Sequence, residues 1–434
     1  MTDETESSRE VVDLQLGDFD SHGVTRARYR GRWIEVEHGI PDERARVEIF
    51  GGTRPRGRIL EVLEPSPDRV EPPCRYFRDW ACGGCQWQQI DYTGQLFRKR
   101  EAIDAVMDGA GLDIRVSAVN RLDDPWRYRT TAGISLGKSA GFRRHGSLAI
   151  VPIHDCPISH PAIGRLMAAL NDHLDEGTLP NFRGRIRLEV RLTGLVAGEE
   201  HLLVLVRPDR ERLPPAEEIQ ALVAVLTAAA EVTGVSVVRR TGDIDTISGP
   251  LLAPTLVAGR PVYLSAASFF QTNLRLLPQL IDGLRISAQP LKGKRVADVY
   301  GGVGLLGLFL ADEAEEVVIV ESDALAIEAG ERTAAEWGRS NIRFLRGRAE
   351  EILPDAGSFD VVIVDPPRTG LTETVVEILA RDRPSLLLYV SCLAQSLARD
   401  LVALREAYRP DGLELFDFYP QTYHVELLAR AHAL

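Results

Sequence analysis

Four short apolar segments in the last third of the chain constrain its fold most strongly. They are Arg295–Tyr300, Glu316–Val320, Phe359–Val364 and Leu386–Val390. Runs of this length, rich in valine, isoleucine and leucine, are typical of strands buried on both faces of a parallel sheet. From Val262 onward such strands alternate with helical spacing, which predicts an α/β sheet. Sheets of this kind bind ligands at the carboxyl ends of their strands.

Residues that could bind a cofactor or take part in catalysis follow each of these segments. The first runs into Gly302, Gly304 and Gly307, a G-x-G-x-x-G loop, and the second ends in Glu321. The third leads into Asp365-Pro366-Pro367-Arg368, whose prolines favour a rigid, extended rim. A glycine loop with an acid on the next strand suits the phosphates and ribose of a dinucleotide or the adenosine of S-adenosylmethionine. These residues alone leave both cofactors open.

The fourth segment ends at Cys392, directly before a stretch with leucines at helical spacing. A helix amino terminus favours the thiolate, so we expect a lowered thiol pKa there. An isolated cysteine flanked by apolar residues is more often simply part of the core. Farther on, His424 and Glu426 alternate, and on a strand they would face the same way.

The amino-terminal region has a different character. After an acidic tail of residues 1–10, which we expect to be disordered, residues 11–70 hold several short strand candidates separated by turns. This pattern predicts a small β-barrel of the type that binds oligonucleotides. Arginines at positions 26, 28, 30 and 32 would share one face of a strand.

Four of the five cysteines, Cys74, Cys82, Cys85 and Cys156, lie in the first part of the chain. We interpret them as thiolate ligands of zinc or of an iron–sulfur cluster, and their spacing does not choose between the two. The start of the chain shows no signal peptide and no segment is apolar enough to span a membrane, so we expect a cytoplasmic protein.

Arginines interleaved with aromatic residues suit phosphate contact combined with base stacking. The candidates for RNA binding are Arg127, Arg129, Phe142, Arg143, Arg144 and Arg368. The alternative is that the arginine stems pack on core aromatics. The net charge of −12 argues against a large unspecific polyanion-binding surface, but not against a local basic groove.

Several motifs in this order resemble the RNA uracil-C5 methyltransferases, which form 5-methyluridine in 23S ribosomal RNA or tRNA. They are the Cys82-Gly83-Gly84-Cys85 knuckle, Ser268–Asn273, Asp365–Arg368, Ser391-Cys392 with Leu397–Asp400, and His424-Val425-Glu426. Residues 40–47 and 65–74 also resemble the TRAM domain, an RNA-binding barrel. The resemblance covers nearly the whole chain.

The resemblance implies a multidomain architecture. It would comprise a TRAM- or OB-like barrel (11–70), a central α+β domain with a cysteine cluster (71–260) and a Rossmann-like methyltransferase domain (261–434). A helix at about 93–118 would pack on the catalytic domain.

The resemblance also implies residue roles. Gln271, Tyr300, Glu321 and Asp365, together with Gly302 and Gly304 of the glycine loop, would bind S-adenosylmethionine. The four amino-terminal cysteines would hold a 4Fe-4S cluster, with zinc as the alternative. Cys392 would be the nucleophile and Glu426 the general base. The expected protein is a monomer acting on 23S rRNA. The alternatives are a tRNA enzyme, a non-catalytic RNA-binding scaffold, or an oxidoreductase that uses a nicotinamide cofactor.

Overall fold

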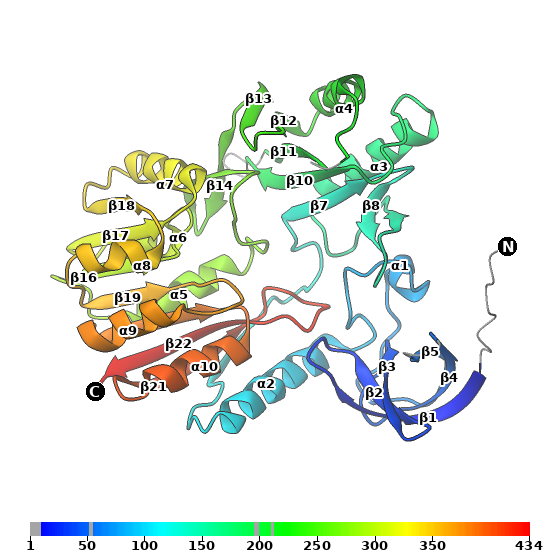
Figure 1. Ribbon diagram of the computed structural model, residues 1–434, viewed down its shortest axis with the longest axis horizontal. Helices are drawn as coiled ribbons and strands as arrows, with labels where there is room; N and C mark the ends of the chain where they lie inside the picture. The colour runs from blue at the N-terminus through cyan, green and yellow to red at the C-terminus, as the bar shows by residue number, and fades with distance from the viewer. Residues whose placement is uncertain (1–9, 52–54, 195–198, 210–211) are drawn as a thin grey trace. The chain divides into compact units, whose positions relative to one another are not determined.

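The computed structural model of the chain describes residues 10–51, 55–194, 199–209 and 212–434. The chain divides into two compact units (Figure 1). The first comprises residues 1–99 and 419–423, and the second comprises residues 100–418 and 424–434. The tail expected to be disordered lies outside the described residues up to position 9. The finer division at residues 70 and 260 stays a prediction.

The first unit contains the expected barrel, which is closed by five strands in the order β1-β2-β3-β5-β4. They are β1 (Glu10–Phe19), β2 (Thr25–Tyr29), β3 (Arg32–Glu37), β4 (Arg44–Phe50) and β5 (Arg56–Glu64). Alternate residues point inward, as the two-residue repeat of a strand requires. The inward side chains form a small apolar core of Leu16, Ala27, Ile34, Val36, Ala45, Val47 and Ile49.

The arginine row expected on one strand face is interrupted by a turn. Arg30 and Gly31 have φ values of 46° and 79° and connect β2 to β3. Two residues with positive φ are typical of a tight hairpin turn. Arg26 and Arg28 remain in β2, where their guanidinium carbons lie 5.4 and 4.2 Å from the centre of the Trp33 ring. Arg26, Arg28 and Trp33 therefore form an arginine–tryptophan cluster on the barrel.

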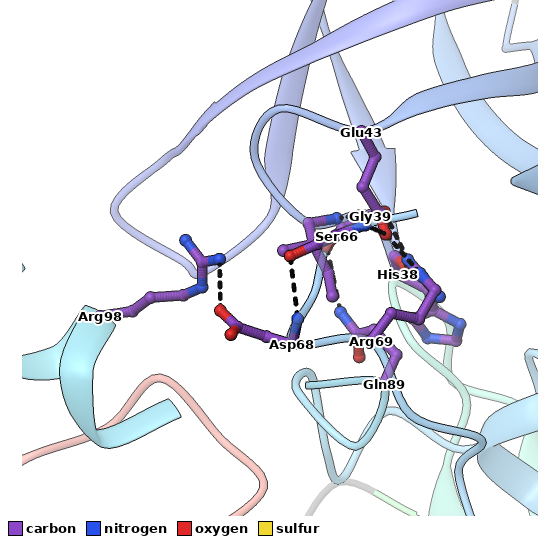
Figure 2. A network of polar contacts seen from close by, with 9 residues as sticks. His38, Gly39, Glu43, Ser66, Asp68, Arg69, Gln89 and Arg98 are labelled. Atoms are coloured by element: carbon purple, nitrogen blue, oxygen red, sulfur yellow. Dashed lines mark hydrogen bonds and ion pairs between the residues drawn. The ribbon is translucent and has the colours of Figure 1, made fainter. Parts of the chain in front are cut away.

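A buried carboxylate fixes the segment that follows the barrel. Glu43 is fully buried and accepts hydrogen bonds from the Ser66 N–H (3.1 Å) and from Nε and Nη2 of Arg69 (2.5 and 2.6 Å). Figure 2 shows these contacts together with the neighbouring ion pair between Asp68 and Arg98. A buried charge is tolerated only when it is paired and hydrogen-bonded, so this network defines the path of residues 66–69.

Residues 419–423 also belong to the first unit. The carbonyl oxygen of Gln421 accepts hydrogen bonds from the backbone N–H groups of Gln86 and Trp87, both at 3.0 Å. The Gln421 N–H donates to Oε1 of Gln95 at 2.8 Å. A loop from near the end of the chain thus completes the hydrogen bonding of this unit.

Two helices follow the barrel, α1 (Arg75–Arg78) and α2 (Tyr92–Gly109). Ile103 and Met107, from the second half of α2, join the main core of the second unit. The helix expected over 93–118 ends at Gly109, shortly before Gly111, whose φ of 72° is incompatible with a helix. Residues 118–120 instead form a strand, β6 (Ala118–Asn120).

The second unit contains a mixed seven-stranded sheet in the order β13-β12-β11-β10-β7-β8-β9, and a separate hairpin of β14 and β15. The elements are β7 (Thr131–Leu136), β8 (Ala140–Arg143), β9 (Ile150–Pro152), α3 (Pro161–Asp175), β10 (Ile186–Thr193), β11 (His201–Pro208), α4 (Ala216–Ala228), β12 (Val232–Val238), β13 (Ile244–Ser248), β14 (Leu252–Val257) and β15 (Arg260–Ser265).

The other large sheet of the second unit has eight strands in the order β18-β17-β16-β19-β20-β22-β21-β6. The elements are α5 (Leu277–Ser287), β16 (Arg295–Val299), α6 (Leu305–Leu310), β17 (Glu316–Glu321), α7 (Ala324–Glu336), β18 (Ile342–Arg346), α8 (Ala349–Ile352), the 3-10 turn η2 (Leu353–Asp355), β19 (Val361–Val364), α9 (Glu373–Asp382), β20 (Leu386–Ser391), α10 (Ala394–Leu404), β21 (Tyr408–Phe416) and β22 (Glu426–Ala433). The four predicted apolar segments form β16, β17, β19 and β20. Together with β18, these strands make up the parallel part of the sheet.

The strand order reverses between β16 and β19, because the chain passes from β16 to β17 and β18 on one side and returns to β19 on the other. Such a switch point leaves a crevice outside the carboxyl ends of the two strands, where ligands bind. The last strand, β22, pairs antiparallel with β20 and with β21, beside which it is labelled in Figure 1. Among the described residues, no helix is long and apolar enough to cross a membrane.

Candidate active site

A cavity lies at the switch point, where sheets of this kind bind ligands. Four predicted cofactor residues line it: Gln271, Tyr300, Gly302 and Asp365. Gln271 is 7% exposed, and its side-chain oxygen has no hydrogen-bond partner among the described residues. A buried acceptor without a partner is costly, so this oxygen is a candidate ligand contact.

The glycine loop after β16 shapes one wall of this cavity. Gly302 has a φ of 57°, and a Cβ added to it would meet nothing within 4 Å, so its backbone faces open space. Gly304 has a φ of 77°, and a Cβ there would lie 2.4 Å from Cδ1 of Ile319. Gly302 therefore keeps the cavity open, while Gly304 permits the loop to pack on the sheet.

Glu321, at the end of β17, is hydrogen-bonded to the same loop. Its carboxylate accepts from the N–H groups of Gly302 (3.0 Å), Ser322 (2.6 Å) and Asp323 (2.8 Å). Glu321 lies beside the residues that line the cavity rather than among them. Three backbone donors hold the carboxylate in one orientation next to the loop.

Asp298 is a lining residue that the sequence analysis missed. It is fully buried in β16, and one of its oxygens accepts from the Gly307 N–H at 2.8 Å. Burial raises the pKa of Asp298 to about 7. Burial, together with the charge of Asp298, also raises the pKa of Asp365 to about 7. An acidic residue in the middle of the apolar run Arg295–Tyr300 was the available signal.

The strand register brings Cys392 and Glu426 together. Ser391, the last residue of β20, pairs with Leu427 of the antiparallel strand β22. Continuing this antiparallel register by one residue places Cys392, which follows Ser391, opposite Glu426, which precedes Leu427. Cys392 is half-buried, whereas Glu426 is 2% exposed. Oε1 of Glu426 has no hydrogen-bond partner among the described residues.

The electrostatics of this pair differ from the expectation for the thiol. Burial and the charge of Glu426 raise the pKa of Cys392, so the lowering expected from the helix amino terminus does not prevail. Burial and Asp365 likewise raise the pKa of Glu426 well above its usual value. Arg368 lowers both pKa values, which puts its positive charge close to the pair.

His424 lies next to Arg368. The distance between Nη2 of Arg368 and Nδ1 of His424 is 3.2 Å. β22 begins at Glu426, so His424 precedes the strand and the alternation expected for the two residues does not apply. The exposed Arg368 is thus held beside the cysteine–glutamate pair by a neighbouring side chain.

The other predicted RNA-binding residues lie on the seven-stranded sheet and the segment before it. Arg127 makes two hydrogen bonds to the Asp155 carboxylate, at 2.6 and 2.9 Å, so its guanidinium has an internal partner. The guanidinium carbon of Arg129 lies 5.6 Å from the centre of the Phe142 ring. Arg143 ends β8 and Arg144 follows it, and both side chains are exposed.

The cysteines do not assemble into a recognisable metal centre. Within the described ranges, no group of three or more histidine, cysteine, aspartate or glutamate side chains is arranged to hold a metal ion. Cys74 is buried before α1, and Sγ of Cys82 accepts the Gly84 N–H at 3.4 Å. Cys74, Cys82 and Cys85 belong to the first unit, and Cys156 belongs to the second. No chemical step is assigned to a metal or cluster.

Comparisons with known proteins agree with the geometry of the second unit. The profile of the tRNA (uracil-5-)-methyltransferase family matches residues 257–429. An RNA methyltransferase of Thermosynechococcus vestitus is 31% identical over 442 residues, with 96% of this chain and 97% of the relative covered. An RNA methyltransferase of Halalkalibacterium halodurans is 29% identical over 448 residues, with 98% and 97% covered.

A solved structure extends the likeness over both units. The Pyrococcus abyssi tRNA (uracil-54, C5)-methyltransferase, solved in complex with S-adenosyl-L-homocysteine, has a TM-score of 0.75. The match covers 98% of this chain and 100% of that one, at 24% sequence identity. At this identity the likeness establishes the fold.

Proposed function

The chain belongs to the RNA uracil-5 methyltransferase family, whose members use S-adenosylmethionine, and from that premise we propose that it methylates carbon 5 of a uridine in RNA through a covalent Cys392 intermediate. The observation that carries the proposal is the register of β20 and β22, which sets Cys392 opposite Glu426. Neither a scaffold nor an oxidoreductase using a nicotinamide cofactor has an evident need for that pair.

The residues around the cavity at the switch point fit S-adenosylmethionine. Gln271 offers a buried acceptor without a partner among the described residues, Gly302 leaves open space, and Glu321 is oriented beside the loop by backbone donors. We propose that these residues, with Tyr300, Gly304 and Asp365, hold the cofactor. When bound, it supplies an electrophilic methyl group on a sulfonium sulfur.

Cys392 would begin the reaction. Carbon 5 of uracil is a weak nucleophile, but addition of the Cys392 thiolate to carbon 6 moves electron density through the ring into an enolate. Carbon 5 then becomes nucleophilic. Arg368 favours the thiolate because its positive charge opposes the effects of burial and of Glu426 on the thiol pKa. Its position also suits a negatively charged enolate.

Glu426 would complete the reaction. Once carbon 5 carries its new methyl group, the proton on that carbon must leave before the ring can regain its double bond. The Glu426 carboxylate takes this proton, the electron pair of the broken C–H bond re-forms the double bond between carbons 5 and 6, and the Cys392 thiolate departs. A buried carboxylate with a raised pKa is a stronger base than an exposed one.

The RNA target is a finer proposal. We propose a uridine of 23S rRNA, held by the arginine–tryptophan cluster of Arg26, Arg28 and Trp33 and by Arg129, Phe142, Arg143, Arg144 and Arg368. Arg127 belongs to the same proposal, although its guanidinium is paired with Asp155. A tRNA uridine is the second candidate, because the matching family profile and the Pyrococcus abyssi neighbour are both named for tRNA.

We propose two further features from the family resemblance. The 4Fe-4S cluster, or zinc, at Cys74, Cys82, Cys85 and Cys156 rests on the family resemblance alone. Iron and sulfide analysis of anaerobically purified protein tests it, and stoichiometric zinc without iron would favour the alternative. The TRAM assignment of the barrel likewise rests on resemblance. Neither enters the mechanism above.

The decisive experiment incubates anaerobically purified protein with methyl-labelled S-adenosylmethionine and separate unmodified 23S rRNA and tRNA. Mass spectrometry of the digested RNA identifies the nucleoside. We expect labelled 5-methyluridine in one fraction, which also names the target. The Cys392→Ala variant should bind cofactor normally but form none. Label in another nucleoside, or 5-methyluridine made by Cys392→Ala, would contradict the mechanism. Cofactor binding without transfer to either RNA would favour the scaffold.

A further inference from the structure

A second cavity of the second unit lies where β7 and β10 meet the segment 266–269. Three arginines line it: Arg129, Arg187 and Arg191. Its one acidic lining residue, Glu189, is already paired with Arg207 at 3.0 and 3.2 Å. The cavity is therefore positively charged. Arg191, which is its most buried arginine, has no role in the reaction proposed above.

Arg191 is the unusual member of this group. It is 7% exposed, and Nη2 donates to the carbonyl oxygen of Ser268 at 2.5 Å. Its other two nitrogens, Nε and Nη1, are buried and have no partner among the described residues. Burial lowers the pKa of Arg191 to about 10, so the guanidinium still carries its charge at neutral pH. The Ser268 hydroxyl is also buried and without a partner within the described ranges.

A buried charge with unused donors is expensive for the folded protein. The cost is offset if an anion enters the cavity, because guanidinium N–H groups make strong, charge-assisted hydrogen bonds to phosphate oxygens. Nε and Nη1 of Arg191 and the Ser268 hydroxyl are three donors of the kind that such an anion accepts.

The neighbouring residues support the same conclusion. A Cβ on Gly133 of β7 would lie 2.3 Å from an Nη atom of Arg187, so only glycine leaves room for the observed position of this exposed arginine over the strand. Phe269 lines both this cavity and the proposed cofactor cavity. A phosphate at Arg191 would thus be close to the place where the target uridine must react.

We propose that this cavity is a binding site for a backbone phosphodiester of the RNA substrate, with Arg191 as its central donor and Arg187 at its edge. The inference rests on the proposed function, because it takes the anion to come from the RNA that is methylated. Extracting a base from a stack requires that its flanking backbone be held, and phosphate contacts do this without reading sequence.

The test measures binding of a fluorescein-labelled RNA hairpin containing unmodified uridines over a series of salt concentrations. Arg191→Met should weaken binding about ten- to a hundredfold, the range expected for lost hydrogen bonds to a charged group. The slope of log affinity against log salt should fall by about 0.7 to 0.9, the value for one phosphate contact. The dissociation constant for S-adenosylmethionine should stay unchanged.

Two more variants keep the test independent of any folding defect at a buried position. Arg187→Gln changes an exposed residue and should also reduce the salt slope. Arg240→Gln is the matched control, because Arg240 is an exposed arginine in the turn between β12 and β13 of the same sheet and does not line the cavity. It should leave affinity and slope as they are.

Neutral methylphosphonate linkages, placed one at a time along the hairpin, identify the phosphate. One linkage should weaken binding to the unaltered protein but not weaken binding to Arg191→Met any further, since the two changes remove the same contact. Additive losses at every linkage, or an unchanged salt slope in both cavity variants, would overturn the site. If RNA binding depends on Arg191 but no methyl group is transferred, the proposed function fails and the site stands. If methylation proceeds and neither cavity variant affects binding, the phosphate site fails and the proposed function stands.

Discussion

Replacing Asp400 by alanine should destabilise the loop that carries Asp365 and Arg368. Asp400, in α10, is 2% exposed. One of its oxygens accepts both the Leu371 N–H, at 2.7 Å, and the Tyr389 hydroxyl, at 2.6 Å. These bonds join α10 to β20 and to the end of the loop that follows β19. The substitution leaves two buried donors without an acceptor.

The expected cost follows from those two donors. Each unsatisfied buried donor costs about 1–3 kcal/mol, so Asp400→Ala should lower the free energy of unfolding by about 2–6 kcal/mol. Tyr389→Phe is the matched control, because it removes a single bond and its donor together and should cost about 1 kcal/mol. The other carboxylate oxygen pairs with the exposed Arg399, which contributes little.

Two measurements test this reasoning. Denaturant unfolding gives the stability difference, and hydrogen exchange by mass spectrometry reports on residues 365–371. The Leu371 amide should exchange faster in Asp400→Ala and at the original rate in Tyr389→Phe. The turnover number for methylation should fall in the alanine variant. A loss of stability no larger than that of Tyr389→Phe, with unchanged exchange at Leu371, would refute the assignment.

Three other changes follow from the same geometry. Glu426→Gln should slow methylation by about 10²- to 10⁴-fold and accumulate a covalent RNA adduct on denaturing gels, whereas rapid turnover without adduct would exclude it as the base. Because burial raises the pKa of Glu426 in the folded state, its protonated form stabilises the fold below the unfolded pKa, and this contribution is lost as pH rises through the folded pKa. Unfolding measured against pH should therefore show a weaker alkaline loss in Glu426→Gln, and an identical profile would argue against a buried carboxyl. Gly304→Ala should cost about 1–3 kcal/mol through its positive φ and its contact with Ile319, seen as a lower melting temperature. Glu43→Ala should cost about 3–5 kcal/mol by leaving Arg69 unpaired, and a double variant that also replaces Arg69 by methionine should recover part of that loss.

The sequence predicted the parallel strands well for a physical reason. A strand covered on both faces is mostly apolar, so β17, β19 and β20 are visible as apolar runs and β16 as a run interrupted only by Asp298. The polar residues that follow them are then placed by topology, since parallel strands end at the same edge. This is why Tyr300, Gly302 and Asp365, which follow β16 and β19, line one cavity, whereas Gln271 of the same cavity was expected there only from the family resemblance.

Properties that depend on distant partners were beyond the sequence. The position of Cys392 opposite Glu426 requires the antiparallel register of β22, which no local pattern encodes. The sequence predicted a lowered pKa for Cys392, because the start of the following helix is apparent from the leucine spacing. Burial and the charge of Glu426, which raise this pKa, depend on residues that are distant in the sequence. No sequence pattern indicates that Arg127 pairs with Asp155. Nor does any pattern distinguish Arg191, which is buried, from the other arginines in strands.

The return of residues 419–423 to the first unit has a consequence for how the protein is made. Synthesis proceeds from the amino terminus, so the barrel and α1 leave the ribosome long before Gln421 does. Until then, the N–H groups of Gln86 and Trp87 and the side chain of Gln95 lack the hydrogen bonds that they make with Gln421 in the finished protein. The amino-terminal unit therefore reaches its final hydrogen bonding only when almost the whole polypeptide has been translated. A chain that ended before residue 419 would lack β22. Its amino-terminal unit would also lack the hydrogen bonds made by residues 419–423.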